Sequence, residues 1–287
     1  MTTSPVNTSA NTQANTSMSA AQTNADLIAS GSGGAALALP TSAVDQWRAY
    51  GRFVRQPFLP DAGAMNTGAK PTARAVGRLL GLDMMFMLAF IGLVGLAAAF
   101  GFEMPDNVNN NLEPGIGMFL MIALLVPIAE ELVFRSWLSG RPPVIAAVLF
   151  FVVGLGSLIW GGSMVQASGG AGSSLGTFLS IMGPALAIIG APLCAALLLK
   201  KPVPAVFARR FAIFYWFSVV SFALVHLANY TEGTLVVLLP LVLPQFVLGT
   251  MLGYLRVHHG LIAAIALHAA HNAILIGFVM LGAGASS

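Results

Sequence analysis

The sequence predicts an all-α fold: a polytopic membrane helix bundle with about seven transmembrane helices and its N-terminus inside. Two features of the composition predict it. Only 8% of the residues are charged, whereas soluble domains average about 25%. Several apolar runs reach about 20 residues, which is the length of a helix that crosses a bilayer. The net charge of +3 is too small to indicate a nucleic acid partner, and none is expected.

The chain is expected to begin with a disordered polar tail over residues 1–43. Residues 1–40 are rich in Ser, Thr, Asn, Ala and Gly and contain no Lys or Arg. Such a segment has too little apolar surface to form a core. It also lacks the basic start and the long apolar stretch of a secretory signal.

A basic juxtamembrane segment is predicted over residues 44–78. Its first part carries aromatic and basic residues that each recur at helical spacing: Trp47, Tyr50 and Phe53 beside Arg48, Arg52 and Arg55. This pattern fits an interfacial helix on an anionic membrane surface. A basic linker without that role is the alternative.

The membrane-embedded domain is predicted over residues 79–283. Its seven apolar segments cover about 79–101, 115–138, 142–161, 176–199, 211–228, 234–255 and 260–283. Four prolines fall inside the fourth and sixth segments: Pro184, Pro192, Pro240 and Pro244. They are expected to bend these helices without ending them, because neighbouring groups in a bundle can satisfy the freed carbonyls.

The basic residues predict the orientation, because they gather at alternate ends of the spans. The basic residues lie before the first span or in the loops that follow the second, fourth and sixth spans: Arg48, Arg52, Arg55, Lys70, Arg74, Arg78, Arg141, Lys200, Lys201, Arg209, Arg210 and Arg256. The loops that follow the first, third and fifth spans hold no Lys or Arg, and they carry the acidic residues Glu103, Asp106, Glu113 and Glu232. Since basic loops stay in the cytoplasm, the N-terminus is expected inside and the C-terminus outside.

A few polar side chains lie inside the apolar segments: Asp83, Glu130, Glu131, Arg135, His226, His268, His271 and Asn272. Ionisable groups are costly in lipid and are functional candidates by default. A structural network that locks helices together is the alternative. Counted along straight helices, Glu130 and His268 lie roughly 16 and 15 Å from the basic end. His226 lies roughly 24 Å from it, which requires the fifth helix to begin outside the bilayer or to tilt.

The spacing of the first motif separates the two glutamates. Glu131 and Arg135 are four residues apart and face each other along a helix. Glu130 lies about 140° around the helix from Arg135. Arg135 is therefore expected to neutralise Glu131 and to leave Glu130 free to face another helix.

The last span carries a second polar face. His268 and Asn272 are four residues apart and share one side of their helix. His271 lies about 60° from the centre of that side. It could support the site from behind or merely pack, and packing is the favoured role.

One glutamate and two histidines on three helices can activate a water molecule. They could do so directly or through a bound zinc held by Glu130, His226 and His268. Imidazole N–H groups and the Asn272 amide could instead donate to an oxyanion. The single cysteine, Cys194, has no histidine at a motif spacing, so a thiol nucleophile has no support.

At these residues the sequence resembles the CAAX prenyl protease and bacteriocin-processing family (CPBP or Abi family) of intramembrane endopeptidases. The resemblance covers roughly residues 115–280 and runs through three motifs. They are E-E-x-x-x-R at Glu130, Glu131 and Arg135, F-x-x-x-H at Phe222 and His226, and H-x-x-x-N at His268 and Asn272. The first two motifs usually lie on consecutive helices, whereas here two extra spans, about 142–199, separate them.

The resemblance implies that Glu130 and His226 activate the attacking water and that His268 and Asn272 stabilise the oxyanion. It implies a peptide or protein substrate, with lipid-modified C-termini among the candidates, and leaves metal dependence and oligomeric state open. We expect an integral protein of a bacterial plasma membrane, with an active site that opens to the cytoplasm. The alternatives are a transporter that uses the Glu/His cluster as a relay, and a non-catalytic immunity or scaffold protein.

Overall fold

The computed structural model describes residues 40–61, 68–111, 113, 115–169 and 173–285. Most of the predicted polar tail, residues 1–39, lies outside this set. The described residues form helices and connecting loops, and their only β-type pairing is an isolated bridge between Asn107 and Tyr230.

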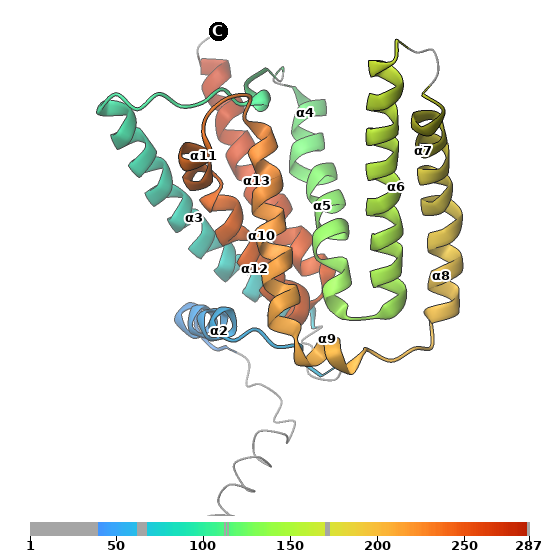
Figure 1. Ribbon diagram of the computed structural model, residues 1–287. Coiled ribbons are helices and arrows are strands. Elements are labelled where there is room, and N and C mark those ends of the chain that lie inside the picture. Colours follow the sequence, from blue (N-terminus) through green and yellow to red (C-terminus); the bar gives the residue numbers. More distant parts are fainter. Residues whose placement is uncertain (1–39, 62–67, 112, 114, 170–172, 286–287) are drawn as a thin grey trace, which may run out of the picture. The chain divides into compact units, whose positions relative to one another are not determined.

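Within the described residues, six helical runs are long and apolar enough to cross a membrane. They are Ala69–Ala99 (α3), Ile116–Phe134 (α4 and α5), Pro142–Ala167 (α6), Ser174–Leu198 (α7 and α8), Phe211–Asn229 (α10 and its last turn) and Leu261–Leu281 of α13 (Leu261–Ala285). Helices α11 (Leu235–Leu241) and α12 (Leu243–His259) meet at 44° and form a seventh span if they are counted together. The prediction of an all-α membrane bundle with about seven spans is confirmed (Figure 1).

The predicted interfacial segment begins with a helix, α2 (Ala43–Arg55), which Ser42 and Asp45 cap reciprocally. The side of α2 that carries Phe53 packs against the bundle, where Phe53 is only 3% exposed. Gln46 donates to the Tyr254 hydroxyl at 2.9 Å, and the Trp47 indole N–H donates to the Arg78 carbonyl at 2.8 Å. Part of the apolar face assigned to the membrane surface is therefore covered by protein, while the basic residues Arg48, Arg52 and Arg55 are exposed.

Helix α3 begins at Ala69, ten residues before the predicted first span at 79. Pro71 falls in its first turn, where a missing N–H removes no helical hydrogen bond. The helix therefore extends past its apolar stretch and carries Lys70, Arg74 and Arg78 on its first turns.

Two spans contain a π-helical turn just before a proline. In Met121–Leu125, the Val126 N–H donates to the Met121 carbonyl, five residues back. Continuing that register would pair the Ile122 carbonyl with Pro127, which has no N–H. In the turn Leu186–Gly190, the Ala191 N–H likewise donates to the Leu186 carbonyl, five residues back, and Pro192 follows directly. The fourth span is thus continuous through its prolines as predicted, whereas the sixth breaks at Val242 between α11 and α12.

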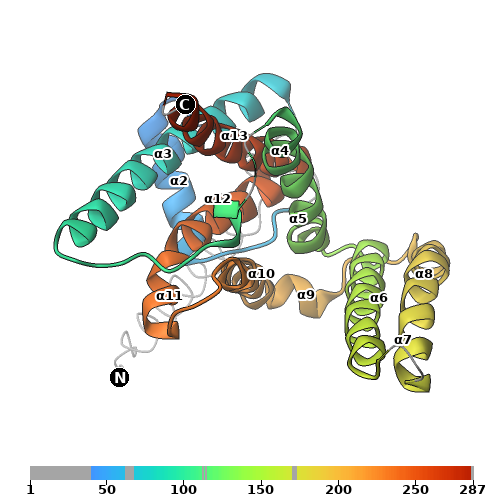
Figure 2. The same ribbon diagram turned by 90° about the horizontal axis from the view of Figure 1, so that it is seen from above.

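The two extra spans form a hairpin at the edge of the bundle (Figure 2), in which α6 lies beside α7 and α8. Its helices approach closely at glycines. A Cβ atom on Gly154 would lie 2.6 Å from the Gly183 carbonyl oxygen, and one on Gly161 would lie 2.6 Å from that of Gly176. Only backbone without side chains can pack at this distance.

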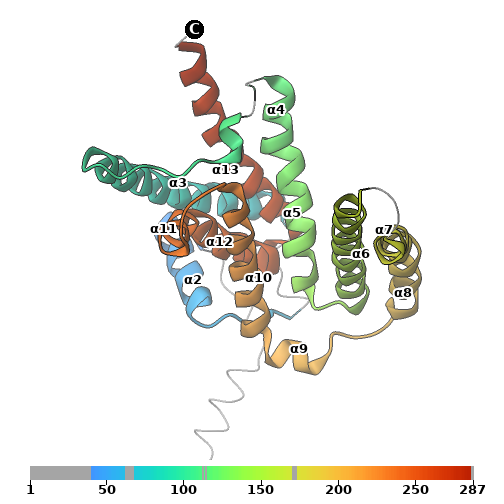
Figure 3. The same cartoon turned by 45° about the horizontal axis from the view of Figure 1, so that its top comes forward.

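Helix α12 forms the centre of the remaining bundle and contacts α3, α10 and α13 (Figure 3). Gly249 and Gly253 are spaced as a G-x-x-x-G pair and lie against α10. A Cβ atom on Gly253 would lie 2.6 Å from Tyr215 Cε2, and one on Gly249 would lie 3.2 Å from Phe222 Cδ1. The glycine pair therefore serves packing within the chain, and it brings α10 close to α12.

Candidate active site

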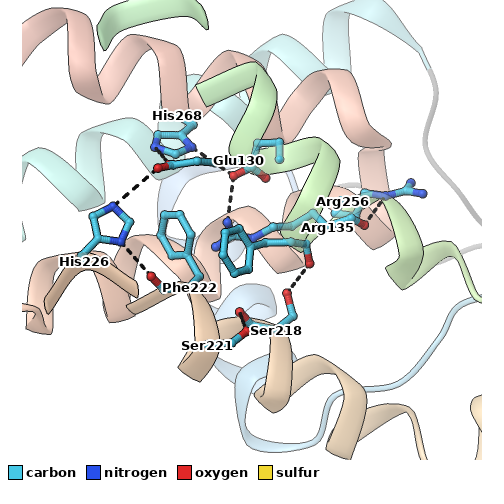
Figure 4. Close-up of polar contacts among 10 residues, drawn as sticks. Glu130, Arg135, Ser218, Ser221, Phe222, His226, Arg256 and His268 are labelled. Carbon is cyan, nitrogen blue, oxygen red and sulfur yellow. Dashed lines mark hydrogen bonds and ion pairs between the residues drawn. The ribbon is translucent and has the colours of Figure 1, made fainter. Parts of the chain in front are cut away.

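Three predicted catalytic side chains meet between α5 (Val126–Phe134), α10 (Phe211–Val225) and α13 (Figure 4). Glu130 Oε1 lies 3.9 Å from His226 Nε2, and Glu130 Oε2 lies 3.5 Å from His268 Nε2. Glu130 thus faces away from Arg135, as its helical angle predicted. His226 lies at the same site despite the greater depth counted for it along the chain.

Glu131 and Arg135 form the predicted pair, with 3.0 Å between Glu131 Oε1 and Arg135 Nη1. Both side chains are fully buried. The guanidinium also stacks on the ring of Phe222, whose centroid lies 3.7 Å from Arg135 Cζ. This contact gives the phenylalanine of the second motif a physical role, because a cation is stabilised over an aromatic face.

Glu131 has a second partner that the sequence spacing did not predict. Its Oε1 lies 3.0 Å from His268 Nδ1. A carboxylate oxygen accepts, so His268 Nδ1 carries the proton in this contact. Glu131 therefore holds the arginine and also orients a histidine that faces Glu130.

His226 is oriented in a comparable way by backbone. Its Nδ1 lies 2.7 Å from the Phe222 carbonyl oxygen, one turn earlier in α10. A carbonyl can only accept, so Nδ1 is the donor and the lone pair of a neutral ring lies on Nε2. Both histidines thus present Nε2 to Glu130.

Asn272 lies on the same face of α13 as His268, as predicted. Its Nδ2 donates to the Ile122 carbonyl at 2.8 Å. This is the carbonyl that the π-helical turn before Pro127 leaves without a helical partner. The contact uses one N–H of the amide and leaves the other for a ligand.

The end of α5 is fixed by two side chains from other helices. Ser218 donates to the Phe134 carbonyl at 2.6 Å. Arg256 donates to the carbonyls of Arg135 and Ser136 at 2.9 and 2.8 Å (Figure 4). The last carbonyls of a helix lack partners within it, and a cation there is favourable. The sequence indicated Arg256 only as one of the basic residues that set the orientation. In the structure it also positions the first motif through these two carbonyls.

Asp83 and His271 form a second buried carboxylate–histidine pair. Asp83 Oδ2 lies 2.6 Å from His271 Nδ1, and both residues are buried. Packing was the favoured role for His271, whereas the structure shows that it is hydrogen bonded to a residue 188 positions away in the sequence.

A cavity of about 530 Å³ lies over the cluster. Its lining includes the four predicted catalytic residues Glu130, His226, His268 and Asn272, together with His271 and Gln245. The site therefore has room for part of a substrate next to Glu130.

Zinc was an expected alternative, with Glu130, His226 and His268 as its ligands. Among the residues that the structure describes, no group of three or more His, Cys, Asp and Glu side chains is arranged to hold a metal ion.

The helices and the cluster define an integral membrane protein with a buried carboxylate–histidine site. Residues 112–274 match the family described as type II CAAX prenyl endopeptidase, Rce1-like. This match covers more than half of the 287-residue chain, and the chain belongs to that family. The predicted resemblance is confirmed, and the protein belongs to a class of membrane proteases. No curated protein and no solved structure shows a match.

Proposed function

We propose that the protein is an intramembrane endopeptidase that hydrolyses a peptide bond with a water molecule activated by Glu130 and His226. One observation carries the proposal. Glu130 faces the Nε2 atoms of His226 and His268 in a cavity, while the adjacent Glu131 is occupied by Arg135 and His268. Two neighbouring carboxylates thus have different surroundings, and only one is directed at the cavity.

The first step is the attack of water on the scissile carbonyl carbon. A water between Glu130 and His226 would donate one hydrogen to the carboxylate and the other to His226 Nε2. Its lone pair would then be directed at the substrate. Glu130 takes a proton from the water as the oxygen–carbon bond forms, which is the role of a general base.

The second step is the collapse of the tetrahedral intermediate. The free N–H of Asn272 would donate to its oxyanion. His268 would do the same if Nε2 is protonated as well as Nδ1, with Glu131 as the counter-charge. The proton held by Glu130 then passes to the leaving nitrogen and the carbon–nitrogen bond breaks. The sum is the addition of one water molecule across the peptide bond.

The test is cleavage of a mixed peptide library by the purified protein in detergent, read by mass spectrometry. We expect products with the wild-type protein and none with Glu130→Ala. A parallel sample with a metal chelator tests the zinc alternative, which predicts loss of cleavage and recovery when zinc is added back. Equal cleavage by wild type and Glu130→Ala would contradict the role of Glu130 as the base, whereas an absence of cleavage by the wild-type protein would favour a relay or scaffold role.

A further inference from the structure

We propose that Gln245 and His271 form a subsite that binds the backbone of a polypeptide substrate beside the candidate catalytic cluster. Both side chains line the cavity that contains Glu130, and neither is a defined position of the three sequence motifs. The description of the ligand as a substrate rests on the proposed function. The subsite itself follows from the contacts and the burial of these two side chains.

Gln245 lies in the first turn of α12, directly after Pro244. Its side-chain Oε1 is buried and has no hydrogen-bond partner among the residues that the structure describes. A buried polar atom without a partner is costly, and such atoms are rare in folded proteins. A molecule in the cavity that donates to Oε1 would remove this cost. The position of Gln245 therefore indicates a ligand rather than a role in packing.

His271 presents one ring nitrogen to the cavity because Asp83 binds the other. His271 Nδ1 donates to Asp83 Oδ2 at 2.6 Å, and Asp83 is fully buried in α3. This bond fixes the ring and directs Nε2 away from α3. Within the described part of the chain, Nε2 has no hydrogen-bond partner. In the neutral ring Nε2 carries the lone pair, so it is a second acceptor in the cavity lining.

The two acceptors match the donors that every polypeptide offers. Counted along α12 and α13 from Gly260, which joins these helices, Gln245 lies at roughly 22 Å and His271 at roughly 16 Å. The two levels differ by roughly 6 Å, close to the roughly 6–7 Å between alternate residues of an extended chain. Alternate residues of such a chain direct their N–H groups to the same side. The subsite would therefore orient a substrate without selecting its side chains.

A purely structural role is the alternative, and it makes a different prediction for Gln245. An amide that serves folding has partners within the chain, and its loss destabilises the protein. An amide without partners can be replaced by a leucine of similar size. Gln245→Leu should therefore unfold at or above the wild-type temperature, because it removes an unsatisfied polar group from the interior.

The test uses the Glu130→Gln protein in detergent, which is expected to bind a substrate without cleaving it. Peptides that it retains from the mixed library are identified by mass spectrometry, and the Kd of one retained peptide is measured. Adding Gln245→Leu or His271→Asn should weaken binding roughly 2–10-fold each, the usual contribution of one neutral hydrogen bond. Asparagine can still donate to Asp83 but has no group at the position of Nε2. Gln166→Leu, in α6 and outside this cavity, is the matched control and should leave the Kd unchanged.

N-methylation of the retained peptide then identifies the backbone contact. Each N–H is methylated in turn, and at least one methylated peptide should bind the Glu130→Gln protein roughly 2–10-fold more weakly. Adding Gln245→Leu should remove that difference, because the acceptor is no longer present. This comparison alone decides the proposal if His271→Asn does not fold.

The proposal is overturned if the Glu130→Gln protein retains no peptide, or if Gln245→Leu and His271→Asn bind as tightly as their parent. It is also overturned if every N-methyl effect is the same with and without Gln245→Leu. Retention that depends on both residues, with no cleavage by the wild-type protein, would contradict the proposed hydrolysis and support the subsite. Wild-type cleavage with a KM that neither substitution changes would support hydrolysis and contradict the subsite.

Discussion

Glu131 binds His268 directly, with 3.0 Å between the carboxylate Oε1 and the imidazole Nδ1. The same oxygen accepts from Arg135 Nη1, also at 3.0 Å. One buried carboxylate thus connects an internal ion pair with a histidine of the candidate site. Changes at Glu131 are therefore expected to affect both folding stability and chemistry.

Glu131→Gln should destabilise the protein strongly, because it leaves the Arg135 guanidinium buried without a counter-charge. Breaking a buried pair in this way costs about 3–5 kcal/mol. We expect a lower unfolding temperature in detergent and lower yield. An unfolding temperature equal to that of wild type would show that Arg135 does not depend on Glu131.

The double variant Glu131→Gln with Arg135→Met should recover part of this stability, since no unpaired cation remains. It should not recover cleavage, because His268 has still lost the carboxylate that orients it. Unfolding temperature and peptide cleavage measured on the same preparation separate the two effects. Full recovery of cleavage would mean that the Glu131–His268 contact has no catalytic role.

Asp83→Ala should lower the free energy of unfolding by about 1–3 kcal/mol, because it leaves the buried His271 Nδ1–H without an acceptor. Asp83→Asn keeps an oxygen acceptor and should cost less. Denaturant unfolding of the two variants in detergent checks the order. If Asp83→Asn unfolds like wild type but does not cleave, the Asp83–His271 pair belongs to the chemistry.

The glycine contacts of the α6–α7 hairpin offer a matched pair of substitutions. An added Cβ on Gly154 would lie 2.6 Å from the Gly183 carbonyl, whereas one on Gly156 meets nothing within 4 Å. Gly154→Ala should destabilise by about 1–3 kcal/mol through overpacking. Gly156→Ala, in the same helix, should match wild type or exceed it by up to about 1 kcal/mol. Equal unfolding of the two variants would contradict the close packing of this hairpin.

Cys194→Ala should leave cleavage unchanged. Cys194 lies in α8 (Ala191–Leu198), in the hairpin at the edge of the bundle, and the cavity lining does not include it. A cleavage assay on the folded variant tests this, and a folded but inactive Cys194→Ala protein would reopen a thiol mechanism.

Local spacing predicted the parts of the site that lie within one helix. The i,i+4 relation placed Arg135 on Glu131 and put Asn272 on the face of His268, because neighbours along a helix are determined by its pitch. The apolar runs likewise predicted the spans, because a bilayer requires their length and composition.

Contacts between helices could not be predicted in this way. The Asp83–His271 and Glu131–His268 bonds depend on which helices are neighbours, and no spacing in the chain encodes that. The capping of α5 by Arg256 has the same origin.

The most direct test is the cleavage rate of Glu130→Gln, measured beside its unfolding temperature. Glutamine keeps the size and hydrogen bonding of Glu130 but cannot take a proton from water. We expect a protein that unfolds like wild type and cleaves at least roughly 10²–10⁴-fold more slowly, the usual contribution of a general base. Wild-type cleavage by a folded Glu130→Gln protein would contradict the assignment of Glu130 as the base.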